Sequence, residues 1–484
     1  MLSFLETKMI NHPTIVTLAL VSTLLLTSFV FSSCEKDNIV EPVEENDEVT
    51  SILTTHLDKE SGLYAIAYNY PFYYYSGKEQ NNTGAIYNKR LVFAWMSDVH
   101  GGNLEYGRFV TYSNHYDDVI DFMLVTGDLS ELAPRDGGWE RTQGYYAKKS
   151  KTPILIGLGN HDVTGNKGNE VVFDSLEEMD NELILPWKEQ IKWTNKGKGS
   201  YYYKDFSGHS YSYRIIMLND YERPRLVADG SWETISYDES LPCYTSKTTY
   251  EIGSKINYSS HSYRAVTKVQ GIAPSRFYFD FIDGRYISKE QAEWLCSALS
   301  TMPLGYRAII CTHMMIGKCK PVECNFTYKN GNTTGFEMCQ NGHVLLDIIN
   351  AYNERSSLSK TYEMTKRTTG GDISGEVIKG FGYSLNYDFS SVPLNNRINF
   401  CLTGHNHFDM VAILCDSYPH NIYNLMITAG APTFQCGDIG NFGEYGKDSF
   451  NIVSVDNNSE LKMMRIGSNL TSDFVERDFI SLCL

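Results

Sequence analysis

Leu91-Val92-Phe93-Ala94-Trp95-Met96-Ser97-Asp98-Val99-His100 is the most informative stretch of this 484-residue sequence. It opens with six consecutive apolar residues, a pattern typical of a strand that is buried on both faces of a sheet. The run stops at a short polar loop that carries a carboxylate and an imidazole. We therefore expect a buried strand that places Asp98 and His100 at one edge of a sheet.

An apolar run that ends in a polar loop recurs four more times. The later loops contain Gly127-Asp128, Gly159-Asn160-His161-Asp162, Thr312-His313 and Gly404-His405-Asn406-His407. Helix-like stretches lie between the runs, at about 103–116, 139–149, 288–300 and 342–352, and Ser288-Lys289-Glu290-Gln291 reads as a capping box. Strands alternating with helices predict an α/β fold, in which ligands bind beyond the carboxyl ends of the strands. We expect all five loops to meet in one site.

The alternation fades between about 166 and 285, which predicts an inserted subregion. Strands are expected there at 201–203, 211–218 and 278–281, and the Tyr-rich remainder is either a lid or substrate wall or a surface excursion. Near the C-terminus, 422–428, 450–455 and 461–466 are expected to complete a second sheet.

The five loops together offer the ligands that a pair of metal ions needs. Two cations about 3.5–4 Å apart require carboxylate, imidazole and amide donors, and one carboxylate must bridge them. Such a pair activates a shared water to hydroxide and binds phosphoryl oxygens. None of the motifs contains Cys, which favours Mn, Fe or Zn held by nitrogen and oxygen. The candidate ligands are Asp98, His100, Asp128, Asn160, His313, His405 and His407.

Each candidate also has an ordinary structural interpretation. Asp98, Asp128 and Asn160 are residue types common in turns and helix caps, and a histidine such as His313 is often a hydrogen-bonded core residue. The ordered set, with every member after an apolar run, favours a metal site.

The five motifs resemble those of the calcineurin-like metallophosphoesterase superfamily, whose pattern is D-x-H, G-D, G-N-H-[DE], a lone His and G-H-x-H. The resemblance covers roughly residues 91–428. It implies a four-layer α/β fold, with two mixed β-sheets sandwiched between helices. It also implies hydrolysis of a phosphate monoester or diester by a hydroxide that bridges two divalent or trivalent metal ions.

The resemblance also implies a role for each motif residue. Asp98, His100 and His407 would hold the first metal ion, whereas Asn160, His313 and His405 would hold the second. Asp128 would bridge the two. His161 would not be a ligand but would stabilise the transition state or protonate the leaving group, and Asp162 would orient His161.

The N-terminus is typical of a targeting segment. An apolar core at 15–31 ends in Phe31-Ser32-Ser33-Cys34, which resembles a bacterial lipoprotein signal, although ordinary secretion with a chance Cys is the alternative. We expect a signal peptide over 1–33, a lipid-anchored acidic tether over 34–56 and the phosphoesterase domain over 57–484. Lipidated Cys34 would anchor the protein in the bacterial cell envelope, at the outer membrane or cell surface.

The net charge of −16 argues against extended nucleic-acid binding, because an acidic surface repels a phosphate backbone. Among the 11 cysteines, Cys296, Cys311, Cys401 and Cys415 lie in apolar runs and are expected in the core. The better disulfide candidates are Cys319, Cys324 and Cys339. A catalytically inactive envelope-binding lipoprotein on the same scaffold is the alternative function. The substrate, the metal and the oligomeric state are not determined by the sequence.

Overall fold

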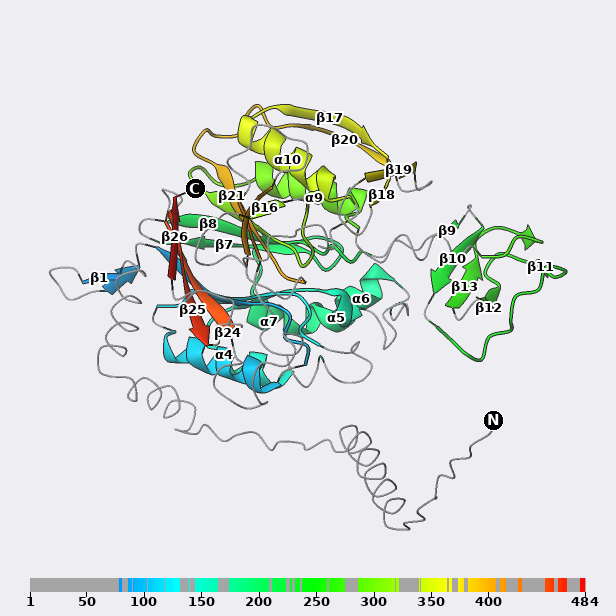
Figure 1. Ribbon diagram of the computed structural model, residues 1–484, viewed down its shortest axis with the longest axis horizontal. Helices are drawn as coiled ribbons and strands as arrows, with labels where there is room; N and C mark the ends of the chain where they lie inside the picture. The colour runs from blue at the N-terminus through cyan, green and yellow to red at the C-terminus, as the bar shows by residue number, and fades with distance from the viewer. Residues whose placement is uncertain are drawn as a thin grey trace, which may run out of the picture. The chain divides into compact units, whose positions relative to one another are not determined.

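The structure is a computed structural model, and Figure 1 shows its elements. It describes residues 78–80, 86–88, 90–101, 103–117, 119–130, 139, 144–163, 173, 175–208, 211–222, 227–228, 231–235, 237–258, 261–274, 286–317, 319–321, 339, 341–363, 365–367, 373–377, 382–405, 410–414, 425–428, 449–456, 460–467 and 479–483. The predicted signal peptide, Cys34 and the tether lie outside these residues. Within them, no helix is both long and apolar enough to span a bilayer.

A six-stranded sheet carries the first three motif loops, in the order β26-β25-β24-β3-β4-β5. β3 (Leu91–Met96), β4 (Phe122–Thr126) and β5 (Ile154–Gly157) run parallel, and every residue in them is buried, as their apolar runs predict. β24 (Ser449–Val455) pairs antiparallel with β3, and β25 (Glu460–Gly467) and β26 (Phe479–Cys483) continue the sheet antiparallel.

An eight-stranded sheet carries the other two motif loops, in the order β16-β22-β23-β21-β15-β8-β7-β6. Its parallel centre consists of β23 (Leu425–Thr428), β21 (Arg397–Thr403), β15 (Arg307–Cys311) and β8 (Ser212–Met217). Antiparallel strands flank this centre: β22 (Met410–Leu414) and β16 (Cys319–Pro321) on one side, β7 (Tyr202–Ser207) and β6 (Asn195–Lys196) on the other. Both sheets are mixed, as expected.

The two sheets pack against each other through aromatic side chains. The buried Tyr202 hydroxyl of β7 accepts a hydrogen bond from Ile156 N of β5 at 2.6 Å and donates one to Ile156 O at 2.9 Å. The rings of Phe122 and Phe206 stack with centroids 4.5 Å apart. These contacts join the sheets into one core and bring their carboxyl ends together.

Helices cover the outer faces and complete the four layers. α4 (Asn103–His115) packs Phe109 and Tyr112 against Phe450 of β24, with ring centroids 5.3 and 5.2 Å apart. α5 (Asn160–Val163), α6 (Leu176–Leu183), η4 (Leu185–Trp187) and α7 (Lys188–Ile191) follow β5. On the eight-stranded sheet, α9 (Lys289–Ser300) and α10 (Gly342–Glu354) contact each other, and α10 contacts β21 (Figure 1).

The predicted inserted subregion contains two kinds of strand. β6 to β8 belong to the eight-stranded sheet. The later strands form a separate four-stranded sheet, β12-β13-β10-β9, and a two-stranded sheet, β11-β14, with their own apolar core around Trp232 and Tyr263. Their bounds are β9 (Val227–Ala228), β10 (Trp232–Ile235), β11 (Thr249–Tyr250), β12 (Lys255–Tyr258), β13 (His261–Ala265) and β14 (Val269–Gln270).

Three further two-stranded sheets are separate from the two main sheets. They are β1 (Lys78–Gln80) with β2 (Ile86–Asn88), β17 (Ser357–Tyr362) with β20 (Tyr383–Asp388), and β18 (Thr365–Arg367) with β19 (Ile373–Val377).

The structure corrects two predictions about elements and agrees with a third where it is described. The expected helix over 139–149 is helical at Trp139 and from Gly144 onwards, and it ends as the 3₁₀ helix η3 (Ala147–Lys149). The C-terminal strands do not share one sheet, because β24 and β25 extend the six-stranded sheet while β23 joins the other. Ser288 caps α9 through Gln291 N, but the Gln291 side chain bonds Asn219 instead of returning to Ser288.

The structure confirms some of the cysteine predictions and not others. Cys296, Cys311 and Cys401 are buried and free, as expected of core residues. Cys339 is also fully buried and pairs with no described cysteine, so the prediction that it forms a disulfide is not confirmed; its Sγ lies 3.5 Å from Asn341 Oδ1. Its backbone N bonds Met315 O, next to the apolar start of α10, which explains its burial. Cys324 and Cys415 lie outside the described residues.

Candidate metal centre

The site is built where five parallel strands end. Asp98 and His100 follow β3, Asp128 follows β4, and Asn160 and His161 begin the short helix α5 after β5. From the other sheet, His313 follows β15 and His405 follows β21. Backbone hydrogen bonds join neighbouring loops, with His100 N donating to Asp128 O and Gly404 N donating to His313 O, both at 2.9 Å.

The backbone is strained at the predicted ligands. Asp98, His100, Asp128 and His405 have positive φ angles of 55°, 49°, 53° and 70°. Non-glycine residues seldom adopt this region, and such residues gather at functional sites when the surrounding structure holds them.

Asp128 lies at the centre of the site. Its Oδ2 is 3.1 Å from His313 Nε2 and 3.8 Å from His100 Nε2, while its Oδ1 accepts a hydrogen bond from His161 N at 2.8 Å. The Asp128 side chain is almost completely buried. A carboxylate held in this way presents one oxygen to two imidazoles from different sheets.

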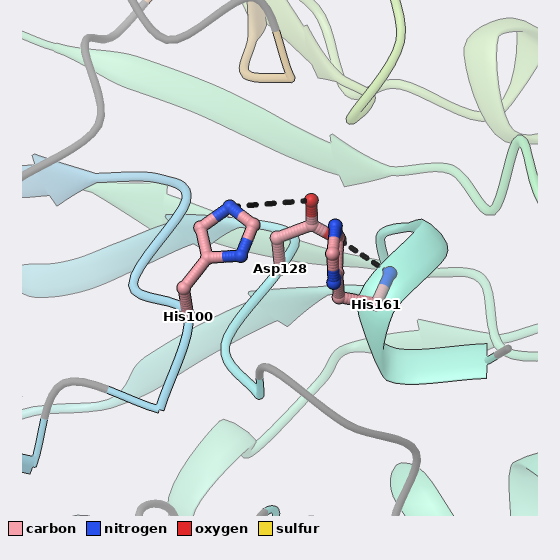
Figure 2. Close-up of side chains that lie close together, drawn as sticks. All are labelled: His100, Asp128 and His161. Carbon is pink, nitrogen blue, oxygen red and sulfur yellow. Dashed lines mark hydrogen bonds and ion pairs between the residues drawn. The ribbon is translucent and has the colours of Figure 1, made fainter. Parts of the chain in front are cut away.

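Two groups of three side chains have ligand atoms within 4.8 Å of one another, and both contain Asp128. The first consists of His100, Asp128 and His161. Figure 2 shows it, with the imidazoles on either side of the carboxylate. The second consists of Asp128, His313 and His405. One carboxylate shared by two clusters is the geometry expected of a bridging ligand.

The remaining predicted ligands lie around these groups. His405 Nδ1 is 3.1 Å from Asn160 Oδ1 and 3.3 Å from His313 Nε2. His405 N donates to both carboxylate oxygens of Asp98, at 2.9 and 3.0 Å, and Asp98 Oδ1 lies 4.0 Å from His313 Nε2. The structure thus brings six of the seven predicted ligands together. His407 lies outside the described residues.

His161 and Asp162 occupy different surroundings although they are adjacent. The His161 ring packs edge-on against His100, with centroids 4.4 Å apart, and its residue is partly exposed. Asp162 is fully buried. Its Oδ1 accepts from Ser130 N and Ser130 Oγ, at 2.9 and 3.0 Å, and its Oδ2 accepts from Gly159 N at 2.9 Å. Asp162 therefore ties the Asp128 loop to the Asn160 loop, and orientation of His161 by Asp162 stays a prediction.

Two motif glycines are required by close approach. A Cβ on Gly159 would lie 2.2 Å from Asp128 Oδ1, and a Cβ on Gly404 would lie 1.9 Å from Ser97 Oγ and 2.8 Å from Asp98 Oδ2. Contacts this short are not tolerated in real structures, so only glycine lets these loops reach the carboxylates.

The sequence model of the calcineurin-like phosphoesterase family matches residues 91–252. The chain contains a calcineurin-like phosphoesterase domain. The match includes the Asp98, Asp128 and Asn160 loops. The protein is a metal-dependent hydrolase of phosphoric esters, and its substrate is a phosphoester.

Solved structures offer only slight likenesses to this phosphoesterase. GAP50, the anchor in the inner membrane complex of Plasmodium, is 11% identical with a TM-score of 0.38, and the match covers 81% of this chain and 89% of that one. Purple acid phosphatase PPD1 from yellow lupin (Lupinus luteus) is 9% identical with a TM-score of 0.37, covering 84% and 58%. Phosphopantetheinyl hydrolase (PptH) from Mycobacterium tuberculosis is 10% identical with a TM-score of 0.31, covering 71% and 91%. At these scores no site or substrate transfers to this chain. The curated proteins contained no match.

The charges of the phosphoesterase site depend on one another. Burial by itself would raise the pKa of Asp128, but the nearby imidazoles, His313 foremost, hold that pKa well below its ordinary value. Burial opposes protonation of His313, yet the carboxylates of Asp128, Asp98 and Asp220 raise its pKa to about 10. Burial and the charge of Asp128 raise the pKa of Asp162 to about 6. The site thus demands positive charge beside Asp128.

A cation fits this demand. Asp128 Oδ2 is buried and its nearest imidazole nitrogen is His313 Nε2, at 3.1 Å, so this carboxylate oxygen keeps lone pairs that a cation could use. Imidazole nitrogens and carboxylate and amide oxygens surround it, and this donor set suits Mn, Fe or Zn. The residues present therefore fit the metal ions that the family implies.

Two residues near the site belong to none of the five motifs. The Tyr221 hydroxyl donates to Asn160 Oδ1 at 3.3 Å and also lies 2.7 Å from Met314 Sδ. The Asp220 carboxylate is fully buried and accepts a hydrogen bond from Met314 N, directly after His313. Both residues follow β8. The apolar run of β8 is the sequence feature that could have pointed to this position, because neither residue belongs to a motif.

Proposed function

We propose that the protein is a dinuclear phosphoester hydrolase in which Asp128 bridges two metal ions. The observation that carries the proposal is the position of Asp128 in both ligand groups, with its buried Oδ2 3.1 Å from His313 Nε2 and 3.8 Å from His100 Nε2. A single metal ion would use the ligand atoms of only one group. Because Asp128 belongs to both groups, two metal ions are proposed.

The proposed ligand sets overlap with the two groups but are not identical to them. Asp98, His100 and His407 would hold the first metal ion, and Asn160, His313 and His405 would hold the second. His161 belongs to the first group by distance but is not proposed as a ligand. The 3.1 Å contact between His405 Nδ1 and Asn160 Oδ1 supports the second set, because both atoms then face the same ion. When bound, such ions lower the pKa of a water molecule and stabilise negative charge on phosphoryl oxygens.

His161 is proposed to act on the substrate. It is partly exposed, unlike the buried His100 and His313, so a phosphoester can reach its imidazole. There a protonated ring donates a hydrogen bond to a phosphoryl oxygen or passes its proton to the leaving oxygen. Asp162 contributes by holding the loops that carry Asp128 and Asn160.

The His313 imidazole is proposed to be oriented by the strand before Asp128. Its Nδ1 lies 2.7 Å from Thr126 O, which leaves Nε2 facing Asp128. A backbone carbonyl that accepts from one ring nitrogen selects the tautomer whose other nitrogen is a free ligand.

Three finer features complete the proposal. The donor set favours Mn, Fe or Zn, and the substrate is a phosphate monoester or diester. The enzyme works in the bacterial cell envelope, attached through lipidated Cys34. The support for the last point is the apolar segment that ends at Cys34, followed by an acidic stretch.

The test compares hydrolysis of p-nitrophenyl phosphate and bis-p-nitrophenyl phosphate by the wild type, Asp128→Asn and His161→Ala, with Mn²⁺ added. Bound metal is counted by elemental analysis. The wild type should bind two ions, D128N should lose metal and activity together, and H161A should keep metal but lose activity. Two bound ions without turnover of a broad phosphoester panel would instead favour an inactive binding protein, and no bound metal would refute the proposal.

A further inference from the structure

Two β-turns with a leucine at the tip precede the neighbouring strands β15 and β21. They are Pro303-Leu304-Gly305-Tyr306 and Pro393-Leu394-Asn395-Asn396, here called the twin turns. In each, the fourth residue donates its backbone N–H to the proline carbonyl, at 3.2 and 3.0 Å. Because the next residues, Arg307 and Arg397, are register partners in the parallel sheet, the turns lie side by side.

Asn396 joins the twin turns into one unit. Its side chain accepts a hydrogen bond from Gly305 N at 2.7 Å and donates to Pro303 O and Met302 O at 3.0 and 3.2 Å. The Asn396 residue is 1% exposed, so water does not compete for these bonds. The tips are therefore held in place.

Both tips project an apolar side chain into solvent. Leu304 is 75% exposed and Leu394 is 78% exposed, the highest values among the large hydrophobic residues that the structure describes. A single exposed leucine needs no explanation. Leu304 and Leu394 lie on turns that are joined by hydrogen bonds. Together they form a pair of exposed apolar side chains, here called the projection, that lies outside the core.

Three arginines surround the projection. Arg355 donates to Leu394 O and Asn396 O, both at 2.6 Å, and Arg307 donates to Asn395 O. Burial lowers the pKa of Arg307 and of Arg355, and the nearby charge of Arg397 lowers both further. The acidic group that faces Arg307 is Asp456, which is paired with Arg90 at 3.2 Å. Positive charge is thus concentrated here in a chain whose net charge is −16.

We propose that the twin turns dock on an anionic phospholipid surface, with Leu304 and Leu394 entering the headgroup layer while Arg307, Arg355 and Arg397 attract lipid phosphates. Apolar side chains beside cations are the combination that binds acidic membranes. The inference depends neither on the proposed metal chemistry nor on a lipid at Cys34.

Docking in this way would leave the metal centre open to solvent. β15 and β21 are parallel, so the twin turns lie before their first residues and His313 and His405 lie after their last. From 307 to 313 the chain rises about 20 Å at roughly 3.3 Å per residue. The surface would hold the enzyme at one end of these strands while phosphoesters enter at the other.

Hydrogen exchange of the full chain tests the proposal locally. The chain is measured free, on phosphatidylcholine vesicles, and on vesicles that also contain phosphatidylglycerol. Segments 302–307 and 393–397 should exchange roughly tenfold more slowly on the anionic vesicles. Because the readout is confined to these segments, an anchor elsewhere in the chain does not produce it.

Matched variants sharpen the test. The double variant L304D/L394D should lose the protection, whereas Ile252→Asp, at a residue that is 73% exposed in the inserted subregion, should keep it. Arg397→Gln should weaken the preference for anionic vesicles roughly fivefold. Phosphatase activity and melting temperature should be unchanged in L304D/L394D, which shows that it folds.

Three results would overturn the proposal. The first is equal exchange in the three conditions, and the second is protection that survives in L304D/L394D. The third is protection that appears without vesicles as the protein concentration rises, because the twin turns would then bind a second copy of the chain.

Discussion

Tyr221 donates its phenolic hydrogen bond to the side-chain oxygen of Asn160, at 3.3 Å. Tyr221 follows β8 of one sheet and Asn160 follows β5 of the other, so this bond crosses between the two halves of the site. Replacing a partner that orients a metal ligand typically lowers metal affinity roughly ten- to a hundredfold. Tyr221 is therefore a positioning residue for the second proposed metal ion.

Tyr221→Phe should reduce metal affinity roughly tenfold or more, because the Asn160 amide loses the donor that fixes its orientation. The measurement is a titration of the metal-free protein with Mn²⁺, read by calorimetry. Tyr211→Phe is the matched control, since Tyr211 donates a comparable bond to Asp121 Oδ1 at 3.1 Å, away from the site. Equal affinities in wild type, Y221F and Y211F would show that Tyr221 has no positioning role.

Gly404→Ala should abolish most activity without unfolding the protein. Its Cβ would lie 1.9 Å from Ser97 Oγ and 2.8 Å from Asp98 Oδ2, which forces the Asp98 loop away from His405. Hydrolysis of p-nitrophenyl phosphate and metal content should fall together. The double variant Ser97→Ala/Gly404→Ala removes the shorter clash and should recover part of the activity, whereas a fully active G404A would contradict the required close approach.

Removing the metal should lower the melting temperature as well as abolish activity. Without a cation, the buried Asp128 carboxylate depends for positive charge on neighbouring imidazoles such as that of His313, 3.1 Å away. A ligand present at about a thousand times its Kd stabilises the folded state by roughly 4 kcal/mol. Differential scanning calorimetry before and after chelation, and after Mn²⁺ is restored, measures the shift. D128N should show a much smaller shift than the wild type.

The stability of the fold should fall as pH rises from about 4.5 through about 7, partly because of Glu222. Burial raises the pKa of Glu222 to about 7, although its bonds to Ser288 and Gln291 oppose this. The folded state therefore binds more protons than the unfolded state between the two pKa values. The resulting stabilisation is complete below the unfolded pKa and is lost as pH rises through the folded one.

Glu222→Gln should flatten this pH dependence, because an amide keeps the same shape without a charge to bury. Urea unfolding at pH 5 and pH 8 gives the difference in free energy. The loss of unfolding free energy between pH 5 and pH 8 should be roughly 1–3 kcal/mol larger for the wild type than for E222Q. This range follows from about 1.36 kcal/mol per pKa unit. Glu239→Gln, at an exposed residue, is the control and should match the wild type. An unchanged slope in E222Q would assign the pH dependence to other groups.

The grouping of Asp98, Asp128, Asn160, His313 and His405 was predictable because of strand geometry. Each follows an apolar run, and parallel strands in packed sheets bring their carboxyl ends to one edge. The division of the C-terminal strands between the sheets was not predictable. β24 pairs with β3, which is distant in the sequence, whereas β23 pairs with β21 and β22.

Local sequence determined which residues bear the chemistry, because each motif is a few residues long and its apolar run predicts a buried strand. Tertiary structure decided how those residues act. Asp128 became central through His100 and His313, which come from different sheets, and Tyr221 reached Asn160 across the core. The twin turns met although ninety residues separate them in the chain. Such relationships depend on how the sheets pack and on which strands become neighbours, and those outcomes arise from contacts distant in sequence that no local pattern records.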